Sequence, residues 1–429
     1  MAAPSAAADR TPGMKEPVSS FRLDPPHRRM ETPRFSSALS TKVDSDAAIE
    51  EVTRALAAGL AGEKPDFAAV FVSHHHGTAI ESLGPRLAQA TGARVLIGCT
   101  GEGIVGTTQE IERGAALSLF GGTLPGTQLR PFVVQARREA EERLGFTKLP
   151  EVVDRSRAGV LLLADPFTFP AGEYLELLNS ELPGVPVVGA MASGGNGPGQ
   201  NLLVTGEGIV ESGAIGVVVE GDVEMRPVVS QGCRPVGKAW VITACKDNLI
   251  VKLGGKQAVQ VLMETLRDVS EEDRALLQNR PFLGLAVDPT KSDFSRGDFI
   301  VRMLVGIEPQ QGAIAVGDSG LRVGQTVQFL VRDAASAGED LTTLMRDRAR
   351  EGPEAKELGS SRGALLFSCN GRGTRMFAKP NHDITCLQSA FAQVVPASGF
   401  FAMGEIGPVG GRNFLHGFTA SVALFRARQ

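Results

Sequence analysis

Short apolar runs alternate with longer amphipathic stretches from Phe35 onward, which is the pattern of an α/β protein. The first apolar runs predict a helix over 78–92 and strands over 67–73, 93–99, 115–120 and 129–137. The same order then restarts, with a helix predicted over 171–182 and strands over 158–165, 185–191, 214–221 and 225–232. Two similar sets in the same order indicate an internal duplication.

Local sequence matches support this duplication. Aligning the two sets places Gly98 on Gly189, and "RPFVVQ" on "RPVVSQ". The hexapeptide "TGEGIV" also occurs twice, at 100–105 and 205–210, but its copies are out of register with those matches. We therefore predict that the two copies occupy different places and that their identity is a turn composition reached twice.

The first copy lies in "TGEGIVG", where Gly101, Gly103 and Gly106 satisfy the G-x-G-x-x-G spacing of dinucleotide-binding loops. That motif needs a helix directly after it, whose amino terminus faces the pyrophosphate. Here the following residues lead into a strand, and Glu102 stands where the phosphates belong. The pattern favours a tight turn, whose glycines adopt positive φ, over a nucleotide site.

The second half of the chain continues the α/β pattern. A strand hairpin closed at "KDN" and then a helix are predicted within 240–269, and a long helix over 334–351 with Asp340 as its cap. The segment "HGFTASVALF" at 416–425 resembles "RGAALSLF" at 113–120, and we predict the same element for both. The other predicted strands fall within 281–289, 299–307, 326–333, 363–373 and 399–407.

These patterns predict an α/β fold with two domains of mixed β-sheets flanked by helices, the amino-terminal domain being internally duplicated. We place the domains at 34–235 and 236–429, with the boundary near Pro235. The segment 1–33 is rich in alanine, proline and charge and lacks periodicity, so we predict a disordered tail and take Met30 as a candidate start.

Composition narrows the classes of function. The chain has 429 residues and a formal net charge of -4, which argues against a broad nucleic-acid-binding surface. No apolar run approaches the length of a membrane helix. The five cysteines are widely spread and include no C-x-x-C pair, so we expect reduced thiols in a cytoplasmic protein, with neither disulfides nor structural zinc.

Consecutive histidines follow the first predicted strand of the duplicated set, in "SHHHG". Adjacent side chains on an extended segment point to opposite faces, so one metal ion cannot easily bind all of them. We expect no metal site. Because α/β sheets bind ligands at the carboxyl ends of their strands, we expect His74 or His75 to line a ligand pocket instead.

Small polar residues follow several other predicted strands, many of them beside glycines. Such turns suit a small polar ligand held by backbone and side-chain donors. Arg372 in "CNGRG" can supply a guanidinium for a carboxylate. The remaining predicted ligand-binding residues are Cys99, Thr100, Glu102, Asp165, Ser193, Cys369, Asn370 and Glu405.

Two cysteines at strand ends leave an enzymatic alternative open. Cys369 lies close along the chain to His382 and Asp383, and a thiol beside a base can be a nucleophile. Cys99 occupies the comparable place after an earlier strand. A small buried cysteine beside a strand usually serves packing, and no triad signature accompanies either residue. We expect a protein that is not an enzyme, with a Cys-dependent enzyme using Cys369 or Cys99 as the alternative.

An ordered series of motifs resembles the FIST proteins, in which a FIST_N domain precedes a FIST_C domain. The motifs span about residues 34–428 and include "FVSHHHG", "IGCTGEGIVG", "VVGAMASGG", "LLFSCNGRG" and "GFFAMGEIGPVGG". The resemblance makes 34–235 the FIST_N-like domain and 236–429 the FIST_C-like domain.

The resemblance implies a cytoplasmic sensory module that recognises small molecules such as amino acids during signal transduction. Some relatives carry an F-box or signalling domains, and some bacterial members are haem-containing nitric-oxide sensors. We expect a stand-alone module without an F-box that binds a small polar ligand and acts through a separate protein partner, with neither nucleic acid nor a membrane as partner. A haem-based gas sensor is a further alternative, and the cofactor is left unassigned.

Overall fold

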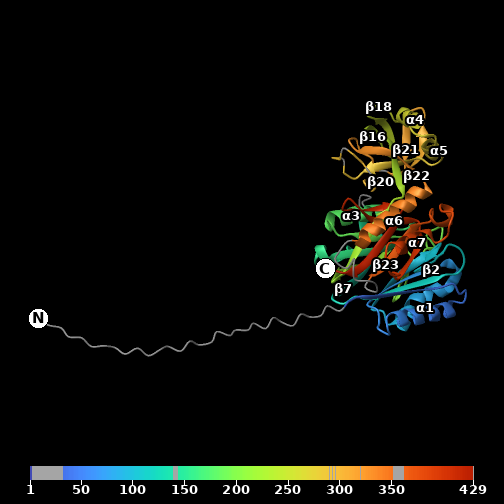
Figure 1. Cartoon of the computed structure of the whole chain (residues 1–429), viewed down its shortest axis with the longest axis vertical. Helices are drawn as coiled ribbons and strands as arrows, with labels where there is room; N and C mark the ends of the chain where they lie inside the picture. The colour runs from blue at the N-terminus through green and yellow to red at the C-terminus, as the bar shows by residue number, and fades with distance from the viewer. Residues whose placement is uncertain are drawn as a thin grey trace. The chain divides into compact units, whose positions relative to one another are not determined.

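The computed structural model describes residues 1, 32–138, 144–288, 290–291, 293–294, 296–318, 320–350 and 362–428 (Figure 1). Residues 2–31 lie outside these ranges, and with them most of the predicted tail and the candidate start at Met30. The chain from Thr32 to Gln429 groups into one unit.

Most strands belong to three mixed sheets of six strands each. The first sheet contains, in spatial order, β1 (Arg34–Ser40), β6 (Leu117–Thr123), β2 (Phe67–Ser73), β3 (Val95–Gly101), β12 (Leu203–Thr205) and β13 (Gly208–Val210). The second contains β7 (Thr127–Val134), β14 (Ala214–Gly221), β10 (Ala158–Ala164), β11 (Val187–Met191), β25 (Gly404–Val409) and β26 (Arg412–His416). The third contains β15 (Val223–Ser230), β27 (Ala420–Ala427), β23 (Arg362–Cys369), β24 (Ala397–Ala402), β4 (Ile104–Val105) and β5 (Glu110–Ile111).

The three sheets share one topology. In each, a parallel pair of strands (β2 with β3, β10 with β11, β23 with β24) lies beside an antiparallel strand (β6, β14, β27). The helices that connect the parallel pairs are α2 (Leu83–Thr91), α3 (Ala171–Glu181) and α7 (His382–Ser389). The chain therefore consists of three units, from β1 to β6, from β7 to β14 and from β15 to β27. The predicted duplication is confirmed, and a third copy occupies the carboxyl-terminal half.

A glycine stands at the same place in the second parallel strand of every unit. Gly98, Gly189 and Gly399 each face a carbonyl oxygen of the neighbouring parallel strand. A Cβ at these positions would lie 1.9, 1.8 and 1.8 Å from that oxygen, so no other residue fits. The predicted match of Gly98 with Gly189 is correct, and Gly399 is its third member.

Each unit donates a hairpin to the sheet of another unit. The hairpin β4–β5 of the first unit pairs with β24, β12–β13 of the second unit pairs with β3, and β25–β26 of the third unit pairs with β11. The exchange is cyclic, and every sheet takes two of its six strands from a different unit. The proposed boundary near Pro235 stays a prediction, but the sheets on its two sides share strands.

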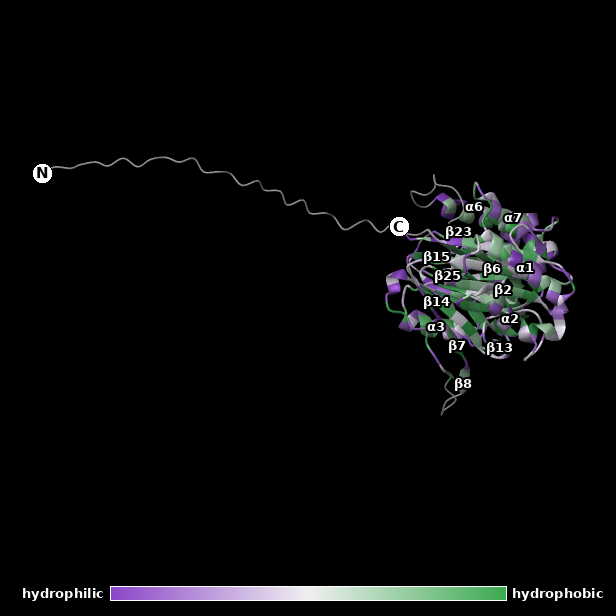
Figure 2. Ribbon diagram, turned by 90° about the horizontal axis from the view of Figure 1, so that it is seen from below, coloured by the Kyte–Doolittle hydropathy of each residue, from purple (hydrophilic) through white to green (hydrophobic). Residues whose placement is uncertain are grey.

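The inner faces of the three sheets form one apolar core. Phe71, Leu163 and Phe367 occupy equivalent positions in the three units, and all three are fully buried in this core. The rings of Phe71 and Phe367 pack edge to face with their centroids 6.0 Å apart. In Figure 2 the strands at the centre of the view are mostly hydrophobic. Such continuous apolar runs are typical of strands buried on both faces.

A separate β-structure is inserted into the third unit between β15 and β23. Its strands β16 and β17 pair with each other as well as with the rest of their sheet, so six strands close into a barrel with β18 as an extension. The helices α4 (Ala258–Asp268) and α5 (Glu271–Asn279) belong to this insertion (Figure 1). The strands are β16 (Cys233–Lys246), β22 (Thr326–Arg332), β19 (Phe282–Ala286), β20 (Phe299–Glu308), β21 (Ala313–Val316), β17 (Leu249–Leu253) and β18 (Lys256–Gln257).

The insertion returns to the third unit through α6 (Ala334–Arg350). The predicted cap of this helix, Asp340, is wrong, because Asp340 lies inside the helix and accepts a hydrogen bond from Ser230. Asp333 is the residue at its start, and its side chain accepts the N–H of Ser336 at 2.7 Å. The remaining elements are α1 (Ser45–Gly59), β8 (Ala136–Arg138), β9 (Leu144–Phe146), η1 (His74–Ser82), η3 (Arg155–Arg157) and η5 (Gly373–Arg375).

Most of the predicted elements are present. The hairpin closed at "KDN" joins β16 to β17, and the predicted equivalence of 416–425 with 113–120 is correct, because β27 and β6 occupy the same place. The two "TGEGIV" copies do lie in different places, one running from β3 into β4 and the other across the β12–β13 turn. The helix predicted over 78–92 begins only at Leu83, after the 3₁₀ segment η1.

Candidate functional site

Equivalent residues stand at the end of the first strand of each parallel pair: Ser73 and Cys369 end β2 and β23, and Asp165 directly follows β10. Each of the three donates its N–H to a carbonyl just before the neighbouring antiparallel strand. The residue that carries this carbonyl also needs an acceptor for its own N–H. The three acceptors are Ser73 Oγ at 2.9 Å, Thr168 Oγ1 at 2.9 Å and Glu405 Oε2 at 3.0 Å. The backbone N–H that precedes the antiparallel strand is therefore satisfied in each unit, but by a different side chain.

In the first unit the strand end carries two exposed histidines. His74 and His75 are exposed, and their rings stack with centroids 4.1 Å apart. Burial, followed by the charge of His74, lowers the pKa of His75. Within the described part of the chain, no hydrogen bond joins either histidine to another predicted site residue, and no group of residues there could hold a metal ion.

In the second unit the predicted residue Asp165 is structural. Its side chain is fully buried, and it accepts hydrogen bonds from Thr168 Oγ1 at 2.5 Å and from Asn201 Nδ2 at 3.2 Å. Both carboxylate oxygens therefore have protein partners. A ligand would have to displace one of them.

Three predicted residues tie the strand ends of the units together. Ser193 donates its N–H to the carbonyl of Thr100 at 3.1 Å, its Oγ accepts the N–H of Glu102 at 2.9 Å, and the same hydroxyl donates to the carbonyl of Phe401. Thr100 Oγ1 also accepts the N–H of Leu202 at 3.0 Å. These contacts join β3, β11 and β24, so the three residues hold the framework of the site.

The glycines of "TGEGIVG" serve close packing at this junction. A Cβ on Gly101 would lie 2.8 Å from Phe400 Cβ, and one on Gly103 would lie 2.8 Å from Phe401 Cδ2. The predicted positive φ is wrong, because none of these glycines adopts it. The strand β4 follows instead of a helix, so the nucleotide-binding reading lacks its required geometry.

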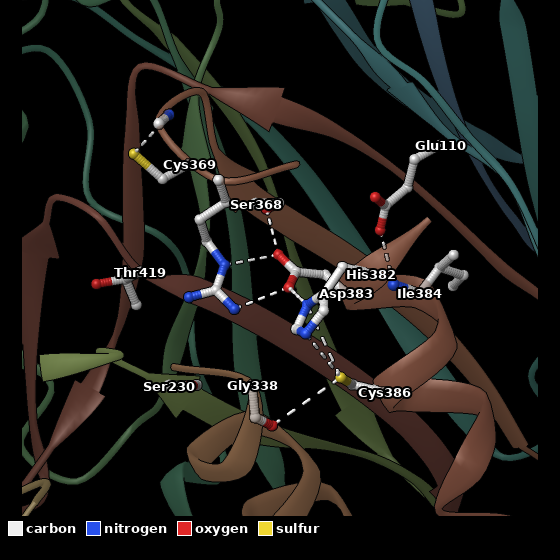
Figure 3. A network of polar contacts seen from close by, with 12 residues as sticks. Glu110, Ser230, Gly338, Ser368, Cys369, His382, Asp383, Ile384, Cys386 and Thr419 are labelled. Carbon is white, nitrogen blue, oxygen red and sulfur yellow. Dashed lines mark hydrogen bonds and ion pairs between the residues drawn. The ribbon is translucent and has the colours of Figure 1, made fainter. Parts of the chain in front are cut away.

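The third unit differs, because buried charges gather at its strand end. Arg372 is fully buried and holds Asp383 through two parallel bonds, Nε to Oδ2 at 2.6 Å and Nη2 to Oδ1 at 2.7 Å. Asp383 also accepts from Ser368 Oγ at 2.6 Å and contacts His382 Nδ1 at 2.9 Å (Figure 3). Burial opposes ionisation of Asp383, but the ion pair with Arg372 outweighs it and lowers the pKa of this carboxyl.

A second guanidinium, Arg332 at the end of β22, lies nearby without a carboxylate. Its Nε and Nη2 are shielded from solvent and have no hydrogen-bond partner among the described residues. The guanidinium stacks over the ring of Phe418 at 5.1 Å. Burial, followed by the charge of Arg372, lowers the pKa of Arg332. The sequence analysis missed this residue, although an arginine ending the apolar run "TVQFLVR" was a detectable signal.

Glu405 carries a carboxyl group into the apolar core beside these arginines. The strand registers place it where the first sheet has Leu203 and the third sheet has Ile104. It is fully buried, and its Oε1 has no partner in the described structure. Burial raises the pKa of Glu405 to about 8, against the opposing effects of the Thr419 N–H, Arg372 and Arg332. Burial therefore favours the neutral form of this carboxyl group.

Two glycines lie against the guanidinium groups of the two arginines. A Cβ on Gly371 would lie 3.7 Å from Arg332 Nη1 and 3.8 Å from Cys369 Sγ, and one on Gly232 would lie 3.1 Å from Arg372 Nη1. Two further shielded atoms, Arg372 Nη1 and Asn370 Oδ1, lack partners among the residues described. We call this cluster the guanidinium site, and it consists of Arg332, Cys369, Asn370, Arg372 and Glu405.

A small cavity of about 40 Å³ adjoins this site at Asn370, and the predicted Glu102 also lines it. An ion pair joins Glu102 to Arg375, and Arg375 Nη1 donates to the carbonyl of Asn370 at 2.8 Å. The structure thus brings Cys369, Asn370, Arg372 and Glu405 together, with Glu102 at their margin. His74, His75, Cys99 and Asp165 are not part of this cluster.

Comparisons with known proteins agree with this architecture. The model of the FIST N domain matches residues 66–256, and that of the FIST C domain matches residues 258–408. The chain belongs to the FIST family. An uncharacterized protein of Mycobacterium bovis is 37% identical over 397 residues, which cover 91% of this chain and 98% of the relative. An uncharacterized protein of Mycobacterium tuberculosis is 36% identical over 395 residues, covering 91% and 99%.

The border between the two FIST matches falls at β18, inside the inserted barrel. The guanidinium site draws on Arg332 from the barrel and on residues of the third unit. In this FIST chain, none of the helices described is long and apolar enough to cross a membrane.

Burial disfavours the nucleophilic thiolate form at two thiols of this FIST protein, those of Cys369 and Cys99. All five cysteines are free. Burial raises the pKa of Cys369 to about 12 and raises that of Cys99 well above its ordinary range. The sulfur near His382 is that of Cys386, at 3.8 Å from Nε2, and not that of Cys369. The geometry therefore gives no support to the enzymatic alternative.

Proposed function

We propose that this FIST chain is a sensory module that binds a small carboxylate at the guanidinium site. The observation that carries the proposal is the free edge of Arg332. Its Nε and Nη2 form the same edge with which Arg372 grips Asp383, and bidentate pairing along that edge is the preferred geometry between arginine and carboxylate. A carboxylate ligand would satisfy two shielded N–H groups that otherwise cost free energy.

The position of Arg332 suggests how binding is transmitted. Arg332 ends the last strand of the barrel and directly precedes Asp333, the cap of α6, whereas the other members of the site belong to the third unit. A ligand that contacts both the barrel and the third unit favours the conformation in which these two lie together, and so it shifts the equilibrium between conformations. A separate cytoplasmic protein partner reads this shift; the module itself performs no catalysis.

The experiment measures thermal stabilisation by acetate, propionate, L-lactate and L-alanine at millimolar concentration. We expect at least one compound to raise the melting temperature. Arg332→Gln removes the fork and weakens binding by about a hundredfold, because it deletes two charge-assisted hydrogen bonds. Arg322→Gln, at an exposed arginine of the same insertion, serves as the matched control and retains binding. Stabilisation by none of the compounds, or equal stabilisation of the Arg332→Gln protein, contradicts the proposal.

A further inference from the structure

We infer that the ligand of the guanidinium site is a small anionic hydroxycarboxylate, in preference to an α-amino acid. The inference rests on the proposed function and narrows its ligand class. It follows from the balance of charge at the site and from the balance of hydrogen-bond donors and acceptors there.

Positive charge exceeds negative charge at the site. Arg372 holds Asp383 in two hydrogen bonds, and Asp383 also contacts His382 Nδ1 at 2.9 Å. Burial lowers the pKa of His382, but its bond to Asp383 outweighs burial and raises the pKa to about 9, so Asp383 is shared by two cations. No carboxylate lies within 4.0 Å of Arg332 in the described structure, and Glu405 is buried in a position that favours its neutral form. A monoanion compensates the charge of Arg332. An amino acid zwitterion adds no net charge, and its ammonium group would be desolvated beside two guanidinium ions.

The polar atoms without partners also favour a hydroxyl over an ammonium group. Three shielded guanidinium nitrogens of the cluster lack partners among the described residues, Arg332 Nε, Arg332 Nη2 and Arg372 Nη1, and Asn370 Oδ1 is a shielded acceptor without a donor. A carboxylate accepts from the Arg332 fork. The second group of the ligand must therefore donate to Asn370 and accept from the remaining guanidinium N–H. A hydroxyl group can do both, whereas an ammonium group has no lone pair.

A carboxylate with no second polar group would satisfy only part of the site. It would occupy the fork of Arg332 but would leave the Asn370 oxygen buried without a donor. Such a loss costs about 1–3 kcal/mol, which corresponds to about tenfold or more in affinity. The predicted order of affinity is therefore hydroxy acid, plain acid, amino acid.

The test uses two matched triads on the full chain: acetate, glycolate and glycine, and propionate, L-lactate and L-alanine. Within each triad only one substituent changes, from hydrogen to hydroxyl to ammonium. Calorimetric titration at pH 7 should show the hydroxy acid binding about tenfold more tightly than the plain acid, and the amino acid binding more weakly than either.

The outcomes separate this inference from the proposed function. If the amino acid binds as tightly as the hydroxy acid, or more tightly, the inference is overturned and the carboxylate site stands. If the plain acids bind as well as the hydroxy acids, the role given to the hydroxyl is overturned. If none of the six compounds binds, the proposed function fails as well.

A variant at Asn370 gives an independent check. Its Oδ1 has no partner among the described residues, so Asn370→Ala should fold normally. We expect this variant to bind lactate and propionate with equal affinity, because the group that distinguishes them is gone. A preference for lactate that survives at full size in Asn370→Ala overturns the assignment of the hydroxyl to this residue.

Discussion

The three units of this chain share a backbone, and one buried position shows how their chemistry differs. Where the first and third sheets hold Leu203 and Ile104, the second holds Glu405, which the third unit contributes through its exchanged hairpin. All three residues are fully buried. A carboxyl group at a position that elsewhere holds aliphatic side chains costs free energy. Its Oε2 accepts the N–H of Thr419, but its Oε1 has no partner among the described residues, so that one bond does not account for the whole group.

The strand ends of the units show the same contrast. Asp165 in the second unit has a protein partner for each carboxylate oxygen, whereas the third unit brings together Asn370, Arg372 and Glu405 with atoms left unpaired. The barrel inserted into this unit alone adds Arg332. The backbone that the three units share forms the framework, and side chains found in the third unit and its inserted barrel form the guanidinium site.

The largest expected effect on folding is at the glycine that all three units share in their second parallel strand. Gly399→Val should prevent folding, because its Cβ would lie 1.8 Å from the carbonyl oxygen of Leu366. Gly98→Val and Gly189→Val should be equally severe, since their Cβ atoms meet the same obstacle. Gly172→Ala, where a Cβ meets no atom within 4 Å, is the control and should change stability by less than about 1 kcal/mol. Circular dichroism and yield of folded protein are the measurements, and a folded Gly399→Val protein would break the proposed equivalence.

A smaller effect is expected at the ion pair that only the third unit contains. Asp383→Ala leaves Arg372 charged, fully buried and unpaired, so it should lower the free energy of unfolding by about 3–5 kcal/mol. Glu50→Ala, which breaks an exposed pair with Arg54, should cost less than about 1 kcal/mol. Urea denaturation measures both. Similar values for the two variants would mean that the buried pair contributes no more than a surface pair.

A third comparison concerns the side chains that accept the backbone N–H before the antiparallel strand of each unit. Ser73→Ala and Thr168→Val each remove the acceptor of one buried backbone N–H, and each should cost about 1–3 kcal/mol. Neither change should affect carboxylate binding. Glu405→Gln keeps an acceptor for Thr419 and should fold with nearly unchanged stability at pH 6. Denaturation and binding measured together check this, and loss of binding in Ser73→Ala would place the ligand elsewhere.

The smallest effect is a dependence on pH that the third unit adds. Burial raises the pKa of Glu405 to about 8 from an ordinary value of 4.5. The folded chain therefore binds more protons than the unfolded chain between these values. The contribution of Glu405 to stability is complete below pH 4.5 and is lost as the pH rises to about 8.

The melting temperature should accordingly fall between pH 6 and pH 9, and less so in Glu405→Gln, which has no proton to lose. Glu110, with a pKa also raised to about 8 by burial, contributes in the same direction and remains in the variant. Anion binding should weaken above pH 8 in the natural chain, because an ionised Glu405 repels the ligand. If the melting temperature of Glu405→Gln depends on pH in the same way as that of the natural chain, Glu405 does not titrate between pH 6 and pH 9.

Much of the fold could be predicted from the sequence, since buried strands such as β2 and β10 are uninterrupted apolar runs and the repeated glycines mark equivalent places. A third and a fourth unit are indicated only faintly after residue 235, because the inserted barrel separates β15 from β23. The third unit is present, and the barrel stands where a fourth was predicted. The cyclic exchange of hairpins is not visible in the sequence, since strands of two or three residues carry almost no periodic signal.

The candidate site was predictable in part. Strand ends identified Cys369, Asn370, Arg372 and Glu405, because polar residues at such positions converge when strands run parallel. Two other residues predicted by the same rule lie outside the cluster: His74 is exposed, and Asp165 has Thr168 and Asn201 as partners. Arg332 could not be assigned, because only the tertiary structure brings β22 to the strand end of the third unit.

The most direct test of the central claim is to follow the side-chain Nε–H resonance of Arg332 by NMR during a titration with L-lactate. The resonance is identified by its loss in Arg332→Lys. The account predicts that it moves progressively and saturates, as expected for an N–H that gains a carboxylate partner. A titration in which lactate binds while the Arg332 resonance stays in place would show that the carboxylate is held elsewhere.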